Sequence, residues 1–271
     1  MLFRKQKRSS KNTDIIDLTA QFKLFAPNSS GQKDARNAVT ARTIRDTIPM
    51  LADFAEELAE EAINVQPIEL FAESATAHGG DADLLKSCLD RHGSDKAQTH
   101  AYHLVYAPML SDRDAVRAVV EIGVGSNNSD VVSALPAHQT PGASLRAFRD
   151  YCPGAMVFGA DVDPRILFSE DRIMTYYVDQ RDPKSLAELA RKVPDDIDLI
   201  IDDGLHSPDA NLAVLRFGME KVRVGGWIAI EDINPAAASF WRLVSRLLPA
   251  NFAPAFLKGR HGMMFAVKRV A

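Results

Sequence analysis

The chain has little cysteine, no long apolar run and no strong net charge. Its 271 residues include only Cys88 and Cys152, too few for a disulfide framework, which is typical of a reducing compartment. No apolar run approaches the roughly 20 residues that cross a bilayer, and the basic start lacks the apolar core of a signal peptide. A net charge of −4 gives no general attraction to nucleic acid or acidic membranes. We therefore expect a cytoplasmic protein without a nucleic-acid or membrane partner.

Strands and helices are expected to alternate after Asp112, in a chain whose composition is typical of globular proteins. This alternation predicts an α/β fold with a Rossmann-like, doubly wound, mostly parallel sheet and helices on both faces. The end of the chain predicts a hairpin, Phe252–Leu257 and Met263–Lys268, that adds an antiparallel edge. The other expected elements are strands Ala118–Ile122, Met156–Ala160, Ile173–Val178, Asp198–Ile201 and Trp227–Ile230, and helices Ala143–Tyr151, Pro183–Lys192 and Pro208–Lys221.

The N-terminal third has a different pattern, and we expect residues 1–93 to form a helical region before a main domain of residues 94–271. A polar start with one weak helix near residues 15–18 is expected first. A helix is then expected over Asp81–Arg91, ending at a glycine, and Ser94 is the expected N-cap of the next helix.

Apolar residues recur at helical spacing from Ala35 to Ile63. Pro49 is expected in the first turn of a second helix within this segment, because a proline ring costs little there and about 3 kcal/mol in a helix interior. The apolar stripe needs a surface to cover it. The segment is therefore expected to pack on the main domain or to join two copies of the chain in a homo-oligomer.

Three successive strand ends of the expected sheet have groups suited to a nucleoside. The first strand runs into Gly123-Val124-Gly125, a turn that lets backbone approach a ligand closely. Asn128 stands where a dinucleotide fingerprint needs its third glycine, which argues against hydride transfer. Asp161 could accept from two ribose hydroxyls, and Asp179 and Gln180 could reach an adenine edge. A helix-capping role for each acid is the alternative, and the three ends together favour the nucleoside.

Acids and a histidine follow the next two strands, in Asp202-Asp203-Gly204-Leu205-His206 and in Glu231-Asp232. The carboxyl ends of neighbouring parallel strands line one crevice, so these groups are expected to converge there. Such a cluster could hold a cation and accept a proton. A helix cap at Asp203 and an ordinary surface histidine at His206 are the alternatives.

With Glu121 inside the first strand and Gly225-Gly226 before the fifth, these motifs resemble the cofactor site of class I S-adenosylmethionine-dependent methyltransferases. The resemblance covers roughly residue 94 to the end of the chain. It implies S-adenosyl-L-methionine as cofactor. The residues that it assigns to the cofactor are Glu121, Gly123, Gly125, Asp161, Asp179, Gln180 and Asp202.

A narrower resemblance rests on Ser94–Lys96, Gly142–Arg146, Asp202–His206 and Ile230–Asp232. These segments together resemble the Mg²⁺-dependent macrolide-sugar, mycinamicin-type O-methyltransferases. The resemblance implies Asp203, Glu231 and Asp232 as Mg²⁺ ligands and His206 as general base.

We therefore expect an S-adenosylmethionine- and Mg²⁺-dependent O-methyltransferase that acts on a hydroxyl of a small molecule or glycosylated natural product. A metal-independent N- or carboxyl-methyltransferase of the same fold and a cofactor-binding scaffold remain alternatives. A nicotinamide-dependent oxidoreductase is a more distant one. The loop of residues 126–141 could be a lid over the site or a simple insertion.

Overall fold

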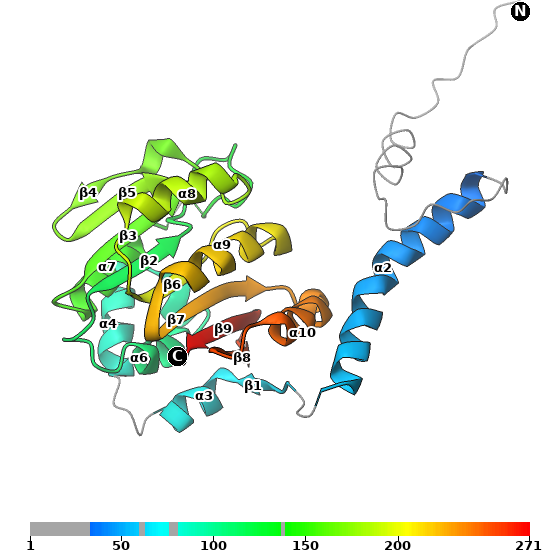
Figure 1. Cartoon of the computed structure of the whole chain (residues 1–271). Helices are drawn as coiled ribbons and strands as arrows, with labels where there is room; N and C mark the ends of the chain where they lie inside the picture. The colour runs from blue at the N-terminus through cyan, green and yellow to red at the C-terminus, as the bar shows by residue number, and fades with distance from the viewer. Residues whose placement is uncertain (1–32, 60–62, 76–80, 137–138) are drawn as a thin grey trace, which may run out of the picture. The chain divides into compact units, whose positions relative to one another are not determined.

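The computed structural model describes residues 33–59, 63–75, 81–136 and 139–271, so the weak helix expected near residues 15–18 lies outside the described part. Two compact units are present. One comprises the described residues before Ile63 together with Ser239–Arg246, and the other comprises Ile63–Ala238 and Leu247–Ala271. The second unit contains the sheet and the expected site residues (Figure 1).

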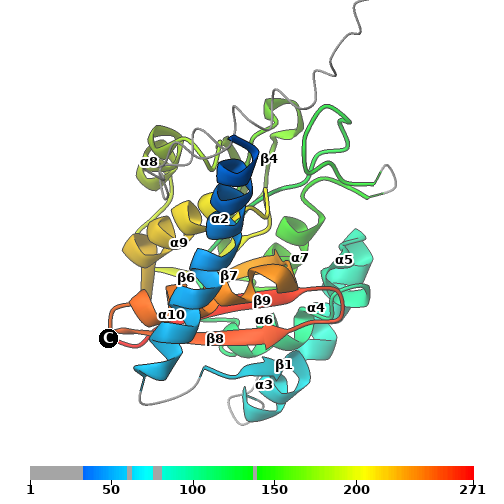
Figure 2. The same cartoon turned by 90° about the vertical axis from the view of Figure 1, so that its right-hand side faces the viewer.

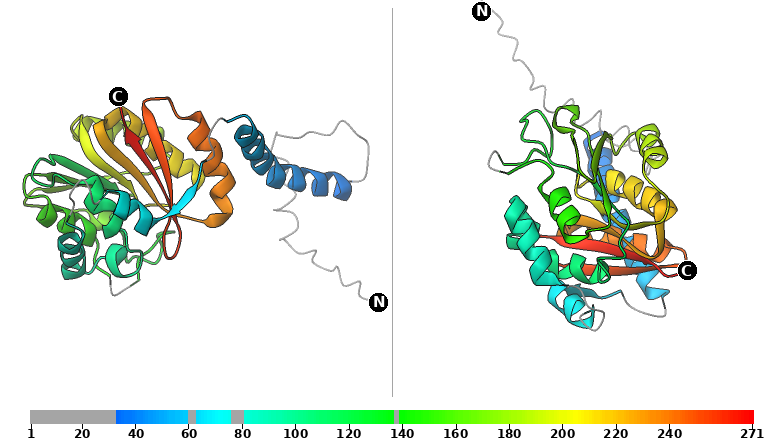
Figure 3. Two further views of the ribbon diagram at one scale, coloured as in Figure 1. Left: turned by 90° about the horizontal axis from the view of Figure 1, so that it is seen from below. Right: turned by 90° about the vertical axis from the view of Figure 1, so that its left-hand side faces the viewer.

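The sheet unit confirms the expected mostly parallel sheet with an antiparallel C-terminal hairpin. Its nine strands are β1 (Val65–Pro67), β2 (Ala118–Ile122), β3 (Met156–Asp161), β4 (Ser169–Glu170), β5 (Ile173–Tyr177), β6 (Ile197–Asp202), β7 (Val222–Ile233), β8 (Phe252–Lys258) and β9 (Met263–Arg269). They lie in the order β1-β8-β9-β7-β6-β2-β3-β5-β4. Figure 3 shows the red C-terminal hairpin continuing the sheet beside the orange β7. β9 is antiparallel to both of its neighbours, β7 and β8.

Helices cover both faces of the sheet (Figure 2). α8 and α9 pack together on one face, and α4, α6 and α7 pack together on the other. Aromatic side chains such as Tyr106 and Phe148 meet edge to face between helices of the second group and are fully buried. The helices of this unit are α3 (Ile68–Ala75), α4 (Ala82–His92), α5 (Asp95–Gln98), α6 (His103–Met109), α7 (Ala143–Tyr151), α8 (Pro183–Lys192) and α9 (Pro208–Lys221).

The strand order reverses at β2, which lies between β3 and β6. Ile122 at the end of β2 pairs with Ala160 of β3 and with Asp202 of β6, and Asp202 pairs with Ile230 of β7. The carboxyl ends of these four strands are therefore level. In open α/β sheets a reversal of this kind leaves the crevice where ligands bind.

A β-bulge interrupts β7 directly after Ile230, at that edge. Ile230 pairs with Phe265 and Ile233 with Met263, so β7 has one extra residue between these two pairs. Asp232, inside the bulge, has a positive φ of 51°. Bulges often re-aim side chains beside active sites.

Two expectations for the N-terminal third need correction. α2 (Lys33–Glu57) is one helix that continues through Pro49, which does not begin a second helix. Pro49 removes one backbone donor, but it lies on an exposed side of α2, where water can satisfy the free carbonyl. Ser94 caps the next helix as expected, because its side chain accepts from the backbone N–H of Lys96. That helix, α5, is short, and Ala101, a buried residue with a positive φ of 60°, lies between it and α6.

The described residues from 63 to 93 belong to the sheet unit, although the sequence grouped them with the N-terminal helices. The physical reason is burial: Ile68, Leu85 and Leu89 are fully buried in the core that also contains β2 and α7. In the other unit, Arg246 of α10 (Ala238–Leu247) bonds Glu56 of α2 at 2.8 Å. None of the helices in the described ranges is both long and apolar enough to span a bilayer.

Candidate active site

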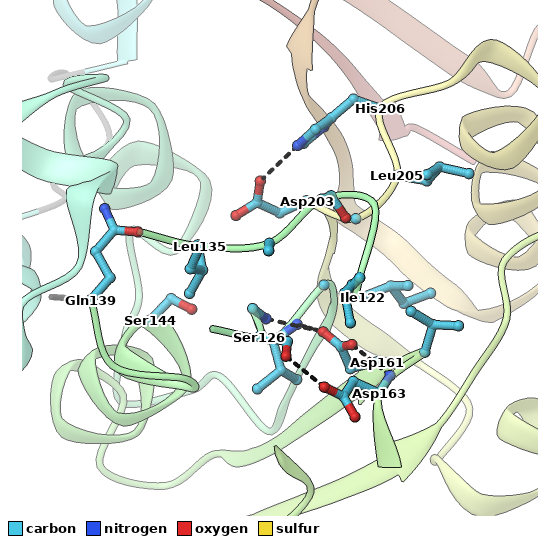
Figure 4. A pocket seen from close by; sticks show the side chains of 18 of the residues that line it. Ile122, Ser126, Leu135, Gln139, Ser144, Asp161, Asp163, Asp203, Leu205 and His206 are labelled. Atoms are coloured by element: carbon cyan, nitrogen blue, oxygen red, sulfur yellow. Dashed lines mark hydrogen bonds and ion pairs between the residues drawn. The ribbon is translucent and has the colours of Figure 1, made fainter. Parts of the chain in front are cut away.

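A cavity of about 640 Å³ opens at the carboxyl ends of β2, β3, β6 and β7. Residues at each of these strand ends line it, including Gly123, Asp161, Asp203 and Asp232. Figure 4 shows Asp161 and Asp203 at the cavity, with the His206 ring pointing toward the Asp203 carboxylate, and one oxygen each of Asp203 and Asp232 lie within 4.8 Å of one another. The expected convergence of the two acid-bearing strand ends is therefore present in the structure.

The backbone at the end of β6 lies so close to the turn after β2 that the turn needs glycine at position 123. Gly123 has a positive φ of 104°, and a Cβ on it would lie 2.0 Å from the backbone oxygen of Asp203. The backbone N–H of Asp203 donates to the Ile122 carbonyl at 2.8 Å. Only glycine allows this approach. The turn thus positions the Asp203 segment as well as one wall of the cavity.

Asp161 has a structural role in the same turn. Its Oδ2 accepts from the backbone N–H groups of Val124 and Gly125 at 2.9 and 3.0 Å, and its Oδ1 accepts from Asp163 at 2.9 Å. A carboxylate has about four acceptor positions, so these three bonds leave one for a ribose hydroxyl. Asp161 lines the cavity and is suitably placed, with less capacity than the sequence suggested.

Asp202 and Gln180 bind each other. Gln180 donates to Asp202 at 2.7 Å and accepts from the backbone of Leu205 at 2.8 Å. Asp202 is fully buried and does not line the cavity; burial raises its pKa to about 6, against opposing hydrogen bonds from Asn211 and Gln180. Both side chains therefore hold the loop after β6, and Gln180 also lines the cavity. Asp179 does line the cavity, where an adenosyl group is expected.

Glu121 is also fully buried behind the cavity wall. Its Oε2 accepts from the Ser144 hydroxyl at 2.6 Å, and its Oε1 lies 3.1 Å from the ammonium of Lys96. Burial raises the pKa of Glu121, and Lys96 opposes that shift. Neither the Glu121 nor the Asp202 carboxylate faces the cavity in the way that a direct cofactor ligand would.

Lys96 is a residue of this cluster that sequence reasoning did not assign to the site. It comes from α5, its side chain is only 3% exposed, and its Nζ lies 2.5 Å from Asp203 Oδ2 and 2.6 Å from Glu231 Oε2. Burial alone lowers the pKa of Lys96, but these carboxylates raise it well above its usual value. Buried carboxylates at strand ends need a buried cation beside them, and this requirement is the one signal that could have predicted a lysine in the cluster.

Glu231 is held on both of its oxygens. The Tyr106 hydroxyl donates to Oε1, and Lys96 donates to Oε2. Glu231 is 1% exposed, and burial together with the charge of Asp203 raises its pKa. Glu231 borders the cavity, but both of its oxygens already accept from protein donors.

Asp203, Asp232 and His206 face the open side. Each presents one atom within 4.8 Å of the others, and His206 Nε2 lies 3.8 Å from Asp203 Oδ1. Tyr102 donates to Asp232 Oδ1 at 2.7 Å, and His100 Nδ1 lies 3.3 Å from the same oxygen. His206, like Asp232, has a positive φ, a strained backbone state for these residue types that often occurs at functional sites.

This donor set fits a hard divalent cation. Mg²⁺ prefers oxygen ligands and usually takes one or two carboxylates, with water and substrate oxygens completing its shell. The carboxylates of Asp203 and Asp232 are partly exposed and converge, which matches that requirement. Both Glu231 oxygens already have protein donors, so Glu231 fits the expected ligand set less well.

Ser126, residues 130–135 and Gln139 border the cavity beside the glycine turn. Leu135 lies so near Gly125 that a Cβ there would be 2.3 Å from its side chain. The Leu135 backbone donates to the Ser126 carbonyl at 2.7 Å, and Gln139 donates to Asp95 at 3.2 Å. A lid and a simple insertion remain the two interpretations of this loop.

The chain is similar to sugar O-methyltransferases over much of its length, although no family model matches it. It is 33% identical over 168 residues to an 8-demethyl-8-alpha-L-rhamnosyl tetracenomycin-C 2'-O-methyltransferase of Streptomyces olivaceus, covering 62% of this chain and 41% of the relative. It is 31% identical over 115 residues to a mycinamicin VI 2''-O-methyltransferase of Micromonospora griseorubida, covering 42% and 27%. The chain spans less than half the length of these curated relatives.

Among solved structures, the chain is similar to the MycE methyltransferase of the mycinamycin pathway in complex with Mg, SAH and mycinamycin VI. The TM-score is 0.54 at 23% identity, covering 69% of this chain and 53% of that chain. The class I methyltransferase fold expected from the sequence is thereby confirmed. The expected resemblance to O-methyltransferases of sugar-bearing natural products is confirmed as well.

Proposed function

We propose that this protein is an S-adenosylmethionine-dependent O-methyltransferase that acts on a sugar hydroxyl of a glycosylated natural product. The observation that supports this most is one cavity in which a class I cofactor cradle adjoins the cluster of Asp203, Asp232 and His206. One relative named above is a 2'-O-methyltransferase of a rhamnosyl tetracenomycin-C and the other is a 2''-O-methyltransferase of mycinamicin VI, which favours the acceptor class.

For the cofactor, we propose that the adenosyl group binds along the ends of β3 and β5. Asp161 would accept a ribose hydroxyl, Asp179 would face the adenine, and the Gly123–Gly125 backbone would border the methionine part. Gln180 would face the adenosyl group from the cavity wall, while Glu121 and Asp202 would support this wall from behind through their bonds to Ser144 and Asn211.

For the chemistry, we propose His206 as the base and Asp203 and Asp232 as the residues that would hold Mg²⁺. The acceptor oxygen would attack the sulfonium methyl carbon, the carbon–sulfur bond would break with its electron pair moving to sulfur, and the hydroxyl proton would pass to His206. Bound Mg²⁺ would supply Lewis-acid polarisation and alignment of adjacent hydroxyls. The His206 ring lies 3.8 Å from Asp203 Oδ1 and lines the cavity, where it would accept that proton.

The test is methyl transfer from methyl-labelled S-adenosylmethionine to a panel of rhamnosylated and macrolide-linked sugars, read by mass spectrometry. Turnover is expected with Mg²⁺ and not with chelator. His206→Ala should lower the rate about 10²- to 10⁴-fold, the usual effect of losing a general base, while binding of S-adenosylhomocysteine persists. The matched control is His92→Ala, because His92 bonds Asp150 and does not line the cavity.

Two results would contradict parts of this proposal. Equal rates for His206→Ala and His92→Ala would show that His206 is not the general base. Full turnover in chelator would favour the metal-independent alternative. The cytoplasmic location and the assembly through N-terminal helices stay predictions.

A further inference from the structure

A buried ammonium lies at the centre of the acidic cluster. Lys96 Nζ is within 3.1 Å of three carboxylates, those of Glu121, Asp203 and Glu231, which follow or lie in three different strands. Glu121 and Glu231 are almost completely buried, so water does not screen these contacts effectively. Lys96 is therefore a fixed internal cation, unlike a lysine of a surface ion pair.

The ammonium and a divalent cation would compete for the same ligands. Lys96 occupies Oδ2 of Asp203, while Oδ1 of Asp203 is the oxygen nearest His206. Lys96 also occupies one oxygen of Glu231, and Tyr106 occupies the other. A second positive charge this close repels a divalent cation as well.

We infer that Lys96 limits the metal affinity of this site, by keeping Glu231 and one oxygen of Asp203 out of the coordination shell. Asp232 and the other oxygen of Asp203 are left for the cation. The inference rests on the proposed function in one respect, the binding of a divalent cation between Asp203 and Asp232. Lys96 is thus a positioning residue that sets how tightly a metal is held.

The consequence is a site that exchanges metal readily and keeps coordination positions open for substrate oxygens. A site with Glu231 as a third carboxylate would bind the metal more tightly and leave fewer open positions. Lys96 also fixes Asp203, because its ammonium lies 2.5 Å from Asp203 Oδ2. The same ammonium compensates the buried charges of Glu121 and Glu231.

The experiment is a Mn²⁺ titration of the purified full chain, without cofactor or acceptor, read by the electron paramagnetic resonance signal of free Mn²⁺. Lys96→Met should bind Mn²⁺ about 10-fold more tightly or better, because a nearby positive charge is removed and Glu231 becomes available. The matched control is Lys86→Met, which removes a lysine from the partly exposed Lys86–Asp90 pair outside the cavity. That control should leave the affinity unchanged.

The double variant Lys96→Met with Glu231→Gln separates the two effects. It removes the buried pair as a unit, restores the charge balance of the wild type and withdraws the added ligand. Its Mn²⁺ affinity should return to within about 3-fold of the wild type, a difference below 1 kcal/mol. A Lys96→Met protein that binds Mn²⁺ no more tightly than the wild type would overturn the inference.

If Lys96→Met does not fold, Glu231→Gln and Asp232→Asn decide the question. The inference predicts that Asp232→Asn loses far more Mn²⁺ affinity than Glu231→Gln, and equal losses would overturn it. The methyl-transfer assay tests the proposed function independently of these titrations. A wild type that is active in chelator would remove the metal from the mechanism, whereas the Lys96→Met titration would still decide what Lys96 does.

Discussion

Each acid of the site is distinguished by its hydrogen-bond partners. Asp161 binds backbone N–H groups of the glycine turn, Asp202 binds side-chain amides, and Glu231 binds an ammonium and a phenol. Among these acids, Asp203 and Asp232 are partly exposed, and one oxygen of each lies within 4.8 Å of the other. The number of acids near a site therefore overstates the number that can serve as ligands.

Asp161 should affect cofactor binding in two ways, through the ribose and through the turn. Asp161→Ala is expected to abolish most of the rise in melting temperature that S-adenosylhomocysteine produces, because it removes both the ribose acceptor and the bonds to Val124 and Gly125. Asp161→Asn, which keeps one acceptor oxygen, should retain part of the rise. The measurement is a thermal melt with and without ligand.

The control for this melt is Asp171→Ala, because the Asp171 side chain is 90% exposed and outside the cavity. Its ligand-induced shift should equal that of the wild type. An equal shift in Asp161→Ala would exclude Asp161 from the site.

At this scale the sequence identified the acids and His206 but not Lys96. The acids follow apolar strands, and strand ends of a parallel sheet predict convergence. Lys96 is 107 positions from Asp203 and 135 from Glu231. No local pattern distinguishes such a lysine from the common exposed kind, because its contacts depend on where α5 packs.

At the scale of elements, the turn between β2 and the cavity shows how backbone geometry positions a site. Gly123→Ala should destabilise the fold strongly, since the added Cβ meets the Asp203 backbone at 2.0 Å. Gly93→Ala is the matched control, because Gly93 also has a positive φ, of 76°, but has open space around its Cβ position. That control should cost only the conformational strain, about 1–2 kcal/mol.

Urea unfolding of the two glycine variants gives the comparison. The account predicts a clearly larger loss of unfolding free energy for Gly123→Ala and weaker binding of S-adenosylhomocysteine. Equal losses for the two variants would show that the turn tolerates a side chain, contrary to the close approach described here.

Element boundaries were predictable wherever start and stop signals are local. α7, α8 and α9 have the expected bounds, and α8 begins with the Asp182-Pro183 signal, in which the Asp182 side chain caps the helix. α2 and the break at Ala101 were not predicted correctly, because each depends on packing that overrides the local preference. The bulge in β7 has no sequence signal of its own, since it depends on pairing with β9.

At the scale of the whole molecule, α2 contributes no residue to the proposed chemistry. Met50, Leu51, Phe54 and Leu58 are large apolar side chains of the α2 region that remain exposed. Apolar groups gathered on one segment often indicate an interface or a substrate cover. This is consistent with the expectation that the N-terminal helices take part in assembly.

Deleting residues 1–62 should therefore change the behaviour of the protein in solution. Arg246 would lose its partner Glu56, and the mass measured by light scattering should fall to that of a smaller assembly, or binding of a hydrophobic dye should increase. A truncated protein with unchanged assembly, unchanged solubility and full activity would contradict this role.

The most direct test of the central claim is a crystal structure of the chain with S-adenosylhomocysteine and Mg²⁺. The account predicts adenosyl density beside Asp161 and Asp179, and a cation bound by Asp203 and Asp232 with His206 facing the acceptor side. Lys96 should still contact Glu231 in that complex. Adenosyl density away from the carboxyl ends of β2 and β3, or a cation bound elsewhere, would contradict it.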